Sequence, residues 1–169
     1  FAANFVGDGG RDSNEIHFSE RILREIYFPG FKACVKAGAL SLMAAYNSID
    51  GIPCSSNKWL LSEVLRDEWG FDGFVVSDYG SVNGILSKHH VVVTPEEGAK
   101  AALECGLDVE LPVTDFFGAP LLQAIKKGLV PQGVLDEAVR RILRTKVLIG
   151  LFDRPFADPD KAEEICGCR

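Results

Sequence analysis

Acidic side chains lie at or near the ends of three short apolar runs in the sequence. Asp78 follows the third run, Asp8 the first, and Asp108 and Glu110 belong to the fourth. In parallel α/β folds the reactive groups gather at the carboxyl ends of the strands. Hydrolysis of a glycosidic bond uses an Asp or Glu that attacks or activates. The positions of these carboxylates therefore favour sugar chemistry.

Asp78 is the sharpest of these candidates. The apolar run Gly73–Ser77 delivers it to a predicted strand end, and Gly80 follows to turn the chain. The alternative interpretation is an Asp that caps the next helix or accepts hydrogen bonds within a turn. Spacing alone does not decide between a reactive carboxylate and a turn carboxylate.

The other candidates have stronger structural interpretations. We expect Asp108 and Glu110 to pair with an Arg or Lys before we expect them to react. Tyr46 closes an apolar run and could be an ordinary core residue, although its hydroxyl would still need a partner. His89 and His90 lack a nearby Cys or His, so we interpret them as solvated and expect neither a metal site nor a cofactor.

Helical segments separate the apolar runs, which are continuous rather than alternating, as in strands covered on both faces. This order predicts a parallel α/β fold. A doubly wound sheet and a (β/α)8 TIM barrel both fit, and since a barrel takes about 250 residues, the four βα units here would be half of one. The predicted strands are Ala2–Val6, Leu40–Tyr46, Gly73–Ser77 and Leu107–Leu111. The predicted helices are Ser19–Ala37 (with a kink or break at Pro29), Asn57–Gly70, Thr94–Gly106, Pro120–Lys127 and Pro131–Ile149.

Composition excludes several classes of function. The 169 residues carry a net charge of −6 with scattered Lys and Arg, so no basic face for nucleic acid is expected. No apolar run approaches the ~20 residues that span a bilayer, so no membrane partner is expected. The five cysteines are irregularly spaced. We expect buried or half-buried thiols at Cys34, Cys54 and Cys105, and no disulfide scaffold or zinc site, although Cys166 and Cys168 are close.

Several motifs in order resemble glycoside hydrolase family 3, and the resemblance covers nearly the whole chain. The motifs are Met43-Ala44-Ala45-Tyr46-Asn47, Asp50-Gly51-Ile52-Pro53-Cys54, Leu60-Leu61, the run from Leu65 to Tyr79, the run from Ala99 to Pro112, Ala138-Val139-Arg140-Arg141-Ile142-Leu143 and Gly150-Leu151-Phe152.

This resemblance implies an α/β domain that is part of a TIM barrel. Residues 1–152 would be its second half, strands five to eight, and residues 153–169 a linker toward a further domain. It implies a retaining β-glycosidase, acting on terminal β-linked glucosyl or xylosyl residues, in which Asp78 is the nucleophile. It also implies that Tyr46 hydrogen-bonds this carboxylate, and that the sugar contacts Asn4, Met43 and Tyr79.

Two departures from the family pattern leave alternatives open. Family members usually carry Lys-His, which grips sugar hydroxyls, where this chain has Ala3 and Asn4. The general acid/base of the family often comes from a second domain, and no residue here is assigned that role, Glu68 included. A non-catalytic carbohydrate-binding module and a half-barrel scaffold are therefore kept as alternatives. Open barrel edges would also favour self-association.

Overall fold

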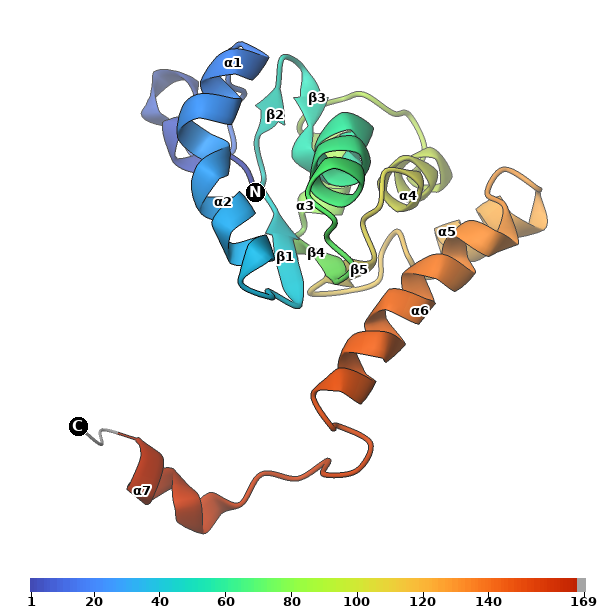
Figure 1. The fold of residues 1–169 in the computed structure, drawn as a ribbon. Coiled ribbons are helices and arrows are strands. Elements are labelled where there is room, and N and C mark those ends of the chain that lie inside the picture. Colours follow the sequence, from blue (N-terminus) through green and yellow to red (C-terminus); the bar gives the residue numbers. More distant parts are fainter. Residues whose placement is uncertain (167–169) are drawn as a thin grey trace.

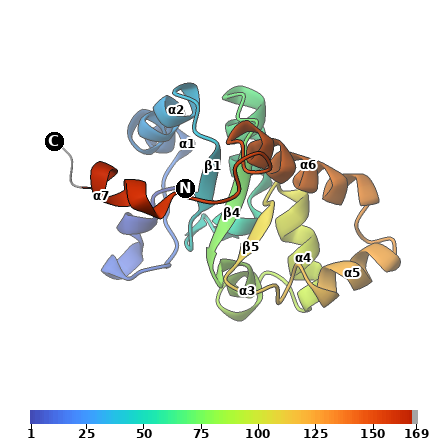
Figure 2. The same cartoon turned by 90° about the horizontal axis from the view of Figure 1, so that it is seen from below.

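Three parallel strands form the centre of the chain in the computed structural model, which describes residues 1–166. The strands are β1 (Ser41–Ala44), β4 (Phe74–Tyr79) and β5 (Val109–Leu111), in the order β1-β4-β5. Figures 1 and 2 show β4 between the other two strands. The predicted α/β class with a parallel sheet is confirmed. The arrangement is consistent with part of a TIM barrel, and the number of βα units stays a prediction.

The first predicted strand, Ala2–Val6, is wrong. The N–H of Ala45 donates to the carbonyl of Phe1, so only the first residue extends the sheet beside β1. Ala3 then takes a left-handed conformation, with φ of 61°, and Asn4–Val6 forms a short 3-10 turn. A left-handed residue cannot continue an extended strand, which is why the apolar run does not become one.

The predicted helix after Ser19 is present and is continuous. It consists of α1 (Glu20–Ile22), a π-helical stretch (Leu23–Tyr27) and α2 (Phe28–Lys36). Proline lacks an N–H for the helical ladder, and the wider π turn lies directly before Pro29. The predicted disturbance at Pro29 is therefore a local change of helix type rather than a break.

The remaining predicted helices are also found. Thr94 and Glu97 form a capping box at the start of the predicted helix Thr94–Gly106. The Asn57 side chain caps the next helix by accepting the N–H of Leu60 at 3.0 Å. These predicted helices are a π-helical segment Trp59–Glu68, α4 (Pro95–Glu104), α5 (Ala119–Lys126) and α6 (Gln132–Leu148). Two further helices, α3 (Ser81–Ser87) and α7 (Ala162–Ile165), were not predicted. Short 3-10 turns lie at Asp8–Gly10, Cys54–Ser56 and Pro159–Lys161.

The two faces of the sheet have different surroundings. Leu42, Val75 and Ser77 are buried, whereas Met43 on the other face is 44% exposed. Met43 pairs in register with Val76, so both side chains lie on this second face. The described residues therefore cover one face and leave the other partly open. Self-association through this open sheet stays a prediction.

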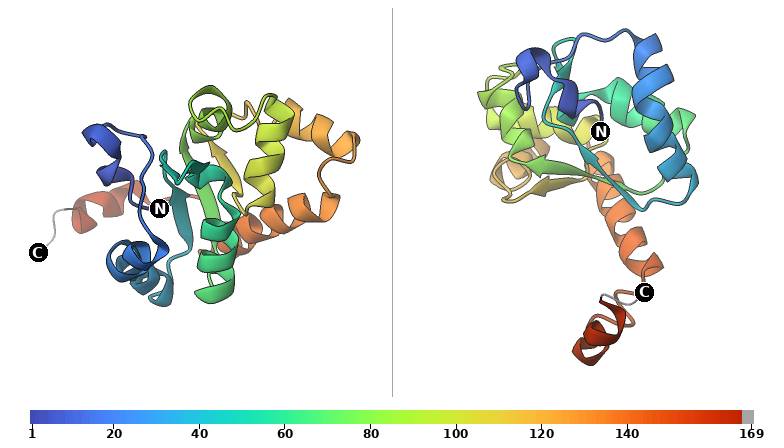
Figure 3. Two further views of the ribbon diagram at one scale, coloured as in Figure 1. Left: turned by 90° about the horizontal axis from the view of Figure 1, so that it is seen from above. Right: turned by 90° about the vertical axis from the view of Figure 1, so that its left-hand side faces the viewer.

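A hairpin and the N-terminal segment lie beyond the carboxyl end of β1. β2 (Ser48–Ile49) and β3 (Ile52–Pro53) pair antiparallel. Ile16 forms a bridge with Ile49, which brings the N-terminal segment beside β2 (Figure 3). α6 leads away from the sheet, and α7 lies apart from the body (Figure 1).

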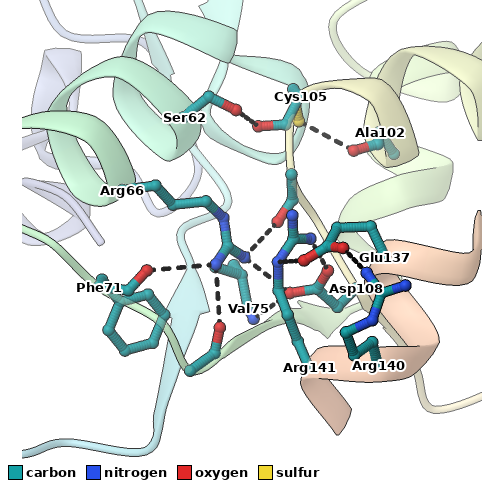
Figure 4. Close-up of polar contacts among 12 residues, drawn as sticks. Ser62, Arg66, Phe71, Val75, Ala102, Cys105, Asp108, Glu137, Arg140 and Arg141 are labelled. Carbon is teal, nitrogen blue, oxygen red and sulfur yellow. Dashed lines mark hydrogen bonds and ion pairs between the residues drawn. The ribbon is translucent and has the colours of Figure 1, made fainter. Parts of the chain in front are cut away.

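A buried carboxylate joins four elements at the amino ends of the strands, as Figure 4 shows. The Asp108 side chain is fully buried and lies 2.8 Å from the guanidinium of Arg66 and 2.7 Å from that of Arg141. It also accepts the N–H of Val75 at 2.8 Å. We call Asp108, Arg66, Arg141 and this N–H the Asp108 cluster.

The Asp108 cluster decides between two interpretations of this residue. The expectation that Asp108 pairs with an Arg is confirmed, but its place at a carboxyl strand end is wrong, because it precedes β5. Burial raises the pKa of Asp108, and both Arg side chains and the N–H of Val75 oppose that rise. Burial also lowers the pKa of Arg66. The pairing therefore offsets a desolvation cost on both partners.

The three cysteines that were predicted to be buried or half-buried differ in their exposure. Cys54 and Cys105 are buried as predicted, but Cys34 is exposed, because it lies on the outward side of α2. Cys168 and the end of the predicted linker 153–169 lie outside the described residues. Within residues 1–166, no helix combines the length and the apolar character that a membrane crossing requires.

We predict that Asp108→Asn destabilises the chain by about 3 kcal/mol, because two guanidinium groups would stay buried without their counter-charge. Urea unfolding followed by circular dichroism would measure the loss. Asp72→Asn is the matched control, since Asp72 forms an exposed pair with Arg144 and should lose less than about 1 kcal/mol. Equal losses in the two variants would contradict the prediction.

Candidate active site

Asp78 lies at the carboxyl end of β4, in the stretch between Val76 and Tyr79 where the register with β5 shifts. Its side chain is half-buried, and one carboxylate oxygen accepts the N–H of Tyr79 at 2.7 Å. Gly80 follows with φ of 71°, a left-handed conformation that glycine adopts without strain, and begins α3. The turn hydrogen bond considered for Asp78 is thus present, and the second carboxylate oxygen is not engaged by it.

Tyr46 brings its phenol to this carboxylate from the neighbouring strand. It lies two residues beyond β1, and Ala44 pairs in register with Ser77, so both carboxyl ends meet at one edge. Burial raises the pKa of Tyr46, and a side-chain hydrogen bond with Asp78 raises it further. A raised pKa keeps the phenol protonated, so Tyr46 can donate to a charged Asp78.

His89 contacts the backbone of Tyr46, and we did not predict this role from the sequence. Its Nε2 atom lies 2.9 Å from the carbonyl oxygen of Tyr46. The two residues are 43 positions apart, so no local spacing could have indicated the contact. The half-buried ring therefore has a defined partner, and interpreting His89 as solvated is wrong.

The three residues expected to contact sugar lie in different surroundings. Tyr79 follows Asp78 in the chain and is 64% exposed. Met43 lies within β1, on the open face of the sheet. Asn4 donates its amide to Asp12 at 3.2 Å, so part of its hydrogen-bonding capacity is already used. Asp12 also acts electrostatically on Tyr46. A sugar-binding role for Asn4, Met43 and Tyr79 stays a prediction.

A polar pocket of about 380 Å³ opens near these groups. His89 is one of its walls, which connects the pocket to Tyr46 through the hydrogen bond described above. Its other linings are Asp8, Ser13, Asn14, Glu15, Ser48, Gly51 and Lys88. Carboxylate, amide and ammonium groups side by side are suited to bind hydroxyl-rich molecules.

The remaining strand-end carboxylate, Glu110, does not face Asp78. Val109 pairs with Val76 on the open face, so Glu110 points to the covered side of the sheet. There it is buried and accepts the N–H groups of Phe116 and Phe117, the latter at 2.7 Å. Burial raises its pKa, and these hydrogen bonds oppose the rise. Glu110 thus holds the loop before α5, and the expected Arg or Lys partner is replaced by backbone groups.

The described residues offer no cluster of metal-ligating side chains. No group of three or more His, Cys, Asp or Glu side chains in residues 1–166 is arranged to hold an ion.

Comparison with known proteins gives one consistent result. The family model described as Glycosyl hydrolase family 3 N terminal domain matches residues 1–145. The chain is 38% identical over 157 residues to a periplasmic beta-glucosidase of Salmonella typhimurium, and this alignment covers 93% of the chain and 20% of that protein. It is 39% identical over 157 residues to a putative beta-xylosidase of Formosa agariphila, covering 92% of the chain and 21% of that protein.

Solved structures agree with these sequence comparisons. A beta-glucosidase from Listeria innocua in complex with glucose superposes with a TM-score of 0.92 at 37% identity, covering 98% of this chain and 23% of that one. A b-glucosidase from Erythrobacter marinus gives 0.93 at 38% identity, covering 99% and 22%. The chain thus spans about a fifth of the length of the curated relatives it matches.

His17 lies among three carboxylates at this end of the molecule, so its contacts depend on pH. It is exposed and lies 3.1 Å from Asp50, 3.3 Å from Glu15 and 3.6 Å from Asp8. The hydrogen bond with Asp50 raises the pKa of His17 above 6.5, and the other two carboxylates add to the rise. His17 therefore links the N-terminal segment to the β2–β3 turn most strongly when it is protonated.

We predict that this link is complete below about pH 6.5 and is lost as pH rises through the higher folded-state pKa of His17. Nuclear magnetic resonance titration of the His17 ring should give a pKa above 6.5. Amide exchange at Asp50, which bonds the carbonyl of Ile16, should accelerate beyond the intrinsic pH effect over the same range. His17→Gln should abolish the additional pH dependence. A His17 pKa at or below 6.5 would overturn the prediction.

Proposed function

The chain belongs to glycoside hydrolase family 3, and from this we propose that it is the part of a retaining β-glycosidase that carries the nucleophile, Asp78. The family model covers residues 1–145, and Asp78 lies within that match. The matched relatives are about five times the length of this chain. The activity of a whole protein of that length is therefore also part of this proposal.

The observation that carries the proposal is the position of Tyr46 and Asp78 just beyond the paired residues Ala44 and Ser77, where a hydrogen bond with Asp78 helps to raise the pKa of Tyr46. A carboxylate nucleophile must be charged and accessible, and a donated hydrogen bond favours its charged form. Asp78 is half-buried at an open strand end with a protonated phenol beside it. Asp108 and Glu110 are enclosed and fully used in structural contacts, so neither is able to attack a sugar.

The proposed reaction is a double displacement. A carboxylate oxygen of Asp78 forms a bond to the anomeric carbon while the bond to the leaving oxygen breaks, and a general acid protonates that oxygen. Water then attacks the same carbon and gives its proton to the deprotonated general acid, which releases Asp78 and restores the original configuration. We assign the general acid to no residue of this chain. Glu68 is unsuited to the role, because its carboxylate forms a two-point pair with Arg24.

We propose a β-glucoside or β-xyloside as the substrate class. Relatives are named beta-glucosidase and beta-xylosidase, and one solved mutant beta-glucosidase holds laminaribiose. The alternative is carbohydrate binding without catalysis, favoured by Ala3 and by the contact of Asn4 with Asp12. Ala3 is buried and offers no polar side chain where the family usually has one.

We predict that an activated 2-deoxy-2-fluoro-β-glucoside labels the chain on Asp78. The fluorine slows hydrolysis of the glycosyl ester, and a good leaving group removes the need for an acid. Intact mass and peptide mapping would locate the label. Asp78→Asn should abolish labelling, and Asp72→Asn, at the opposite end of β4, should leave it unchanged.

A folded chain that binds the sugar in calorimetry but takes no label would replace the proposal with the carbohydrate-binding alternative. Label on another carboxylate would reject Asp78 as the nucleophile.

We also predict that Tyr46→Phe slows labelling about 10- to 100-fold, because a hydrogen bond to a charged group contributes about 1.5–3 kcal/mol. Phe keeps the ring and removes only the hydroxyl. Tyr27→Phe is the matched control, since Tyr27 packs against Phe18 away from Asp78. Equal rates in Tyr46→Phe and the unmodified chain would show that the phenol does not assist the nucleophile.

A further inference from the structure

We infer that His89 is a positioning residue for the nucleophile, because its ring holds the Tyr46 backbone from which the phenol reaches Asp78. The inference rests on the proposed function of Asp78 for its catalytic consequence. Its structural content, that His89 fixes Tyr46, stands on geometry and is tested separately below.

His89 is itself fixed by the end of α3. Its N–H donates to the carbonyl of Gly84 at 2.9 Å, and the N–H of Val91 donates to Ile85 at 3.2 Å. His90 then turns the chain with φ of 54°. The His89 ring is therefore carried by an anchored segment rather than by a free loop.

Tyr46 needs such a support because it lies outside the sheet ladder. It follows the end of β1 and precedes β2. A half-buried carbonyl requires a hydrogen-bond donor, and His89 supplies one at 2.9 Å. Since this bond fixes the peptide plane after Tyr46, it limits the direction in which the Tyr46 side chain leaves the backbone.

The same segment holds a second loop at this edge. Lys88 donates to the carbonyl of Asp12 at 3.3 Å, and the Asp12 carboxylate accepts the amide of Asn4 at 3.2 Å. Residues 88 and 89 therefore connect the end of α3 to the N-terminal loop and to Tyr46. Through these two contacts, α3 determines where Tyr46, the partner of Asp78, lies. The same helix begins directly after Gly80, close to Asp78 in the chain.

The contact fixes the protonation of the ring. A carbonyl oxygen only accepts hydrogen bonds, so Nε2 of His89 must carry a proton. Nitrogen-15 spectra of the unmodified chain should show His89 with a protonated Nε2, whether neutral or charged. A neutral ring protonated only on Nδ1 would overturn the inference without any variant.

The variants are chosen to separate the donor from the ring. His89→Phe keeps a ring and removes the donor, and His89→Gln restores an N–H of similar reach. We expect the Tyr46 pKa, followed in carbon-13 tyrosine spectra, to fall toward its ordinary value of 10.0 in His89→Phe. It should stay raised in His89→Gln and in the control His90→Asn, which changes the exposed neighbour.

Labelling of Asp78 supplies the functional readout. His89→Phe should slow it on the order of tenfold, and His89→Gln should restore the rate to within about twofold. In a Tyr46→Phe background, His89→Phe should cause little further loss, because both changes act through one phenol. Additive losses, or an unchanged Tyr46 pKa in His89→Phe, would overturn the inference. Absent labelling with the expected Tyr46 titration would reject the nucleophile while keeping the His89 contact.

Discussion

The buried carboxylate of Asp108 is the constraint on which the sheet depends. It binds Arg66 from one helix, Arg141 from α6 and the N–H of Val75 at the start of β4. Arg66 in turn donates to the carbonyls of Gly73 and Gly106 at 2.9 and 3.0 Å, which lead into β4 and β5. One desolvated charge therefore ties the starts of two strands to the end of one helix and the middle of another. Such a group has few alternative arrangements, because any other leaves a buried charge unpaired.

A fixed arrangement at the amino ends of the strands leaves the carboxyl ends available for chemistry. The ladder between β1 and β4 transmits the register from Ser41 and Phe74 to Ala44 and Ser77. Tyr46 and Asp78 follow these last partners, so their encounter depends on the register and on the turn after β1, where His89 contacts the Tyr46 carbonyl. A slip of one residue would send Asp78 to the covered face. Asp108, which is structural, and Asp78, the proposed nucleophile, thus lie at opposite ends of one short sheet.

Burial and partners separate the carboxylates that looked alike in the sequence. Asp108 has two guanidinium partners and Glu110 has two backbone N–H partners, and both are enclosed. Asp78 keeps a partly open side chain and a phenol beside it. The preference for structural roles at Asp108 and Glu110 was therefore sound. Two of the wrong expectations, Ala2–Val6 as a strand and Cys34 as a buried thiol, concern segments whose geometry depends on one positive φ and on helix orientation.

The sequence by itself determined the α/β class, five helical segments, and Asp78 as the candidate nucleophile, because periodicity and motifs are local signals. Only the tertiary structure decided which strand ends meet, that Asp108 belongs to the opposite end from Asp78, and that His89 holds Tyr46. These contacts join residues 33 to 43 positions apart. No local pattern encodes such pairs, because they exist only when the strands have taken their register and the helices have packed against them.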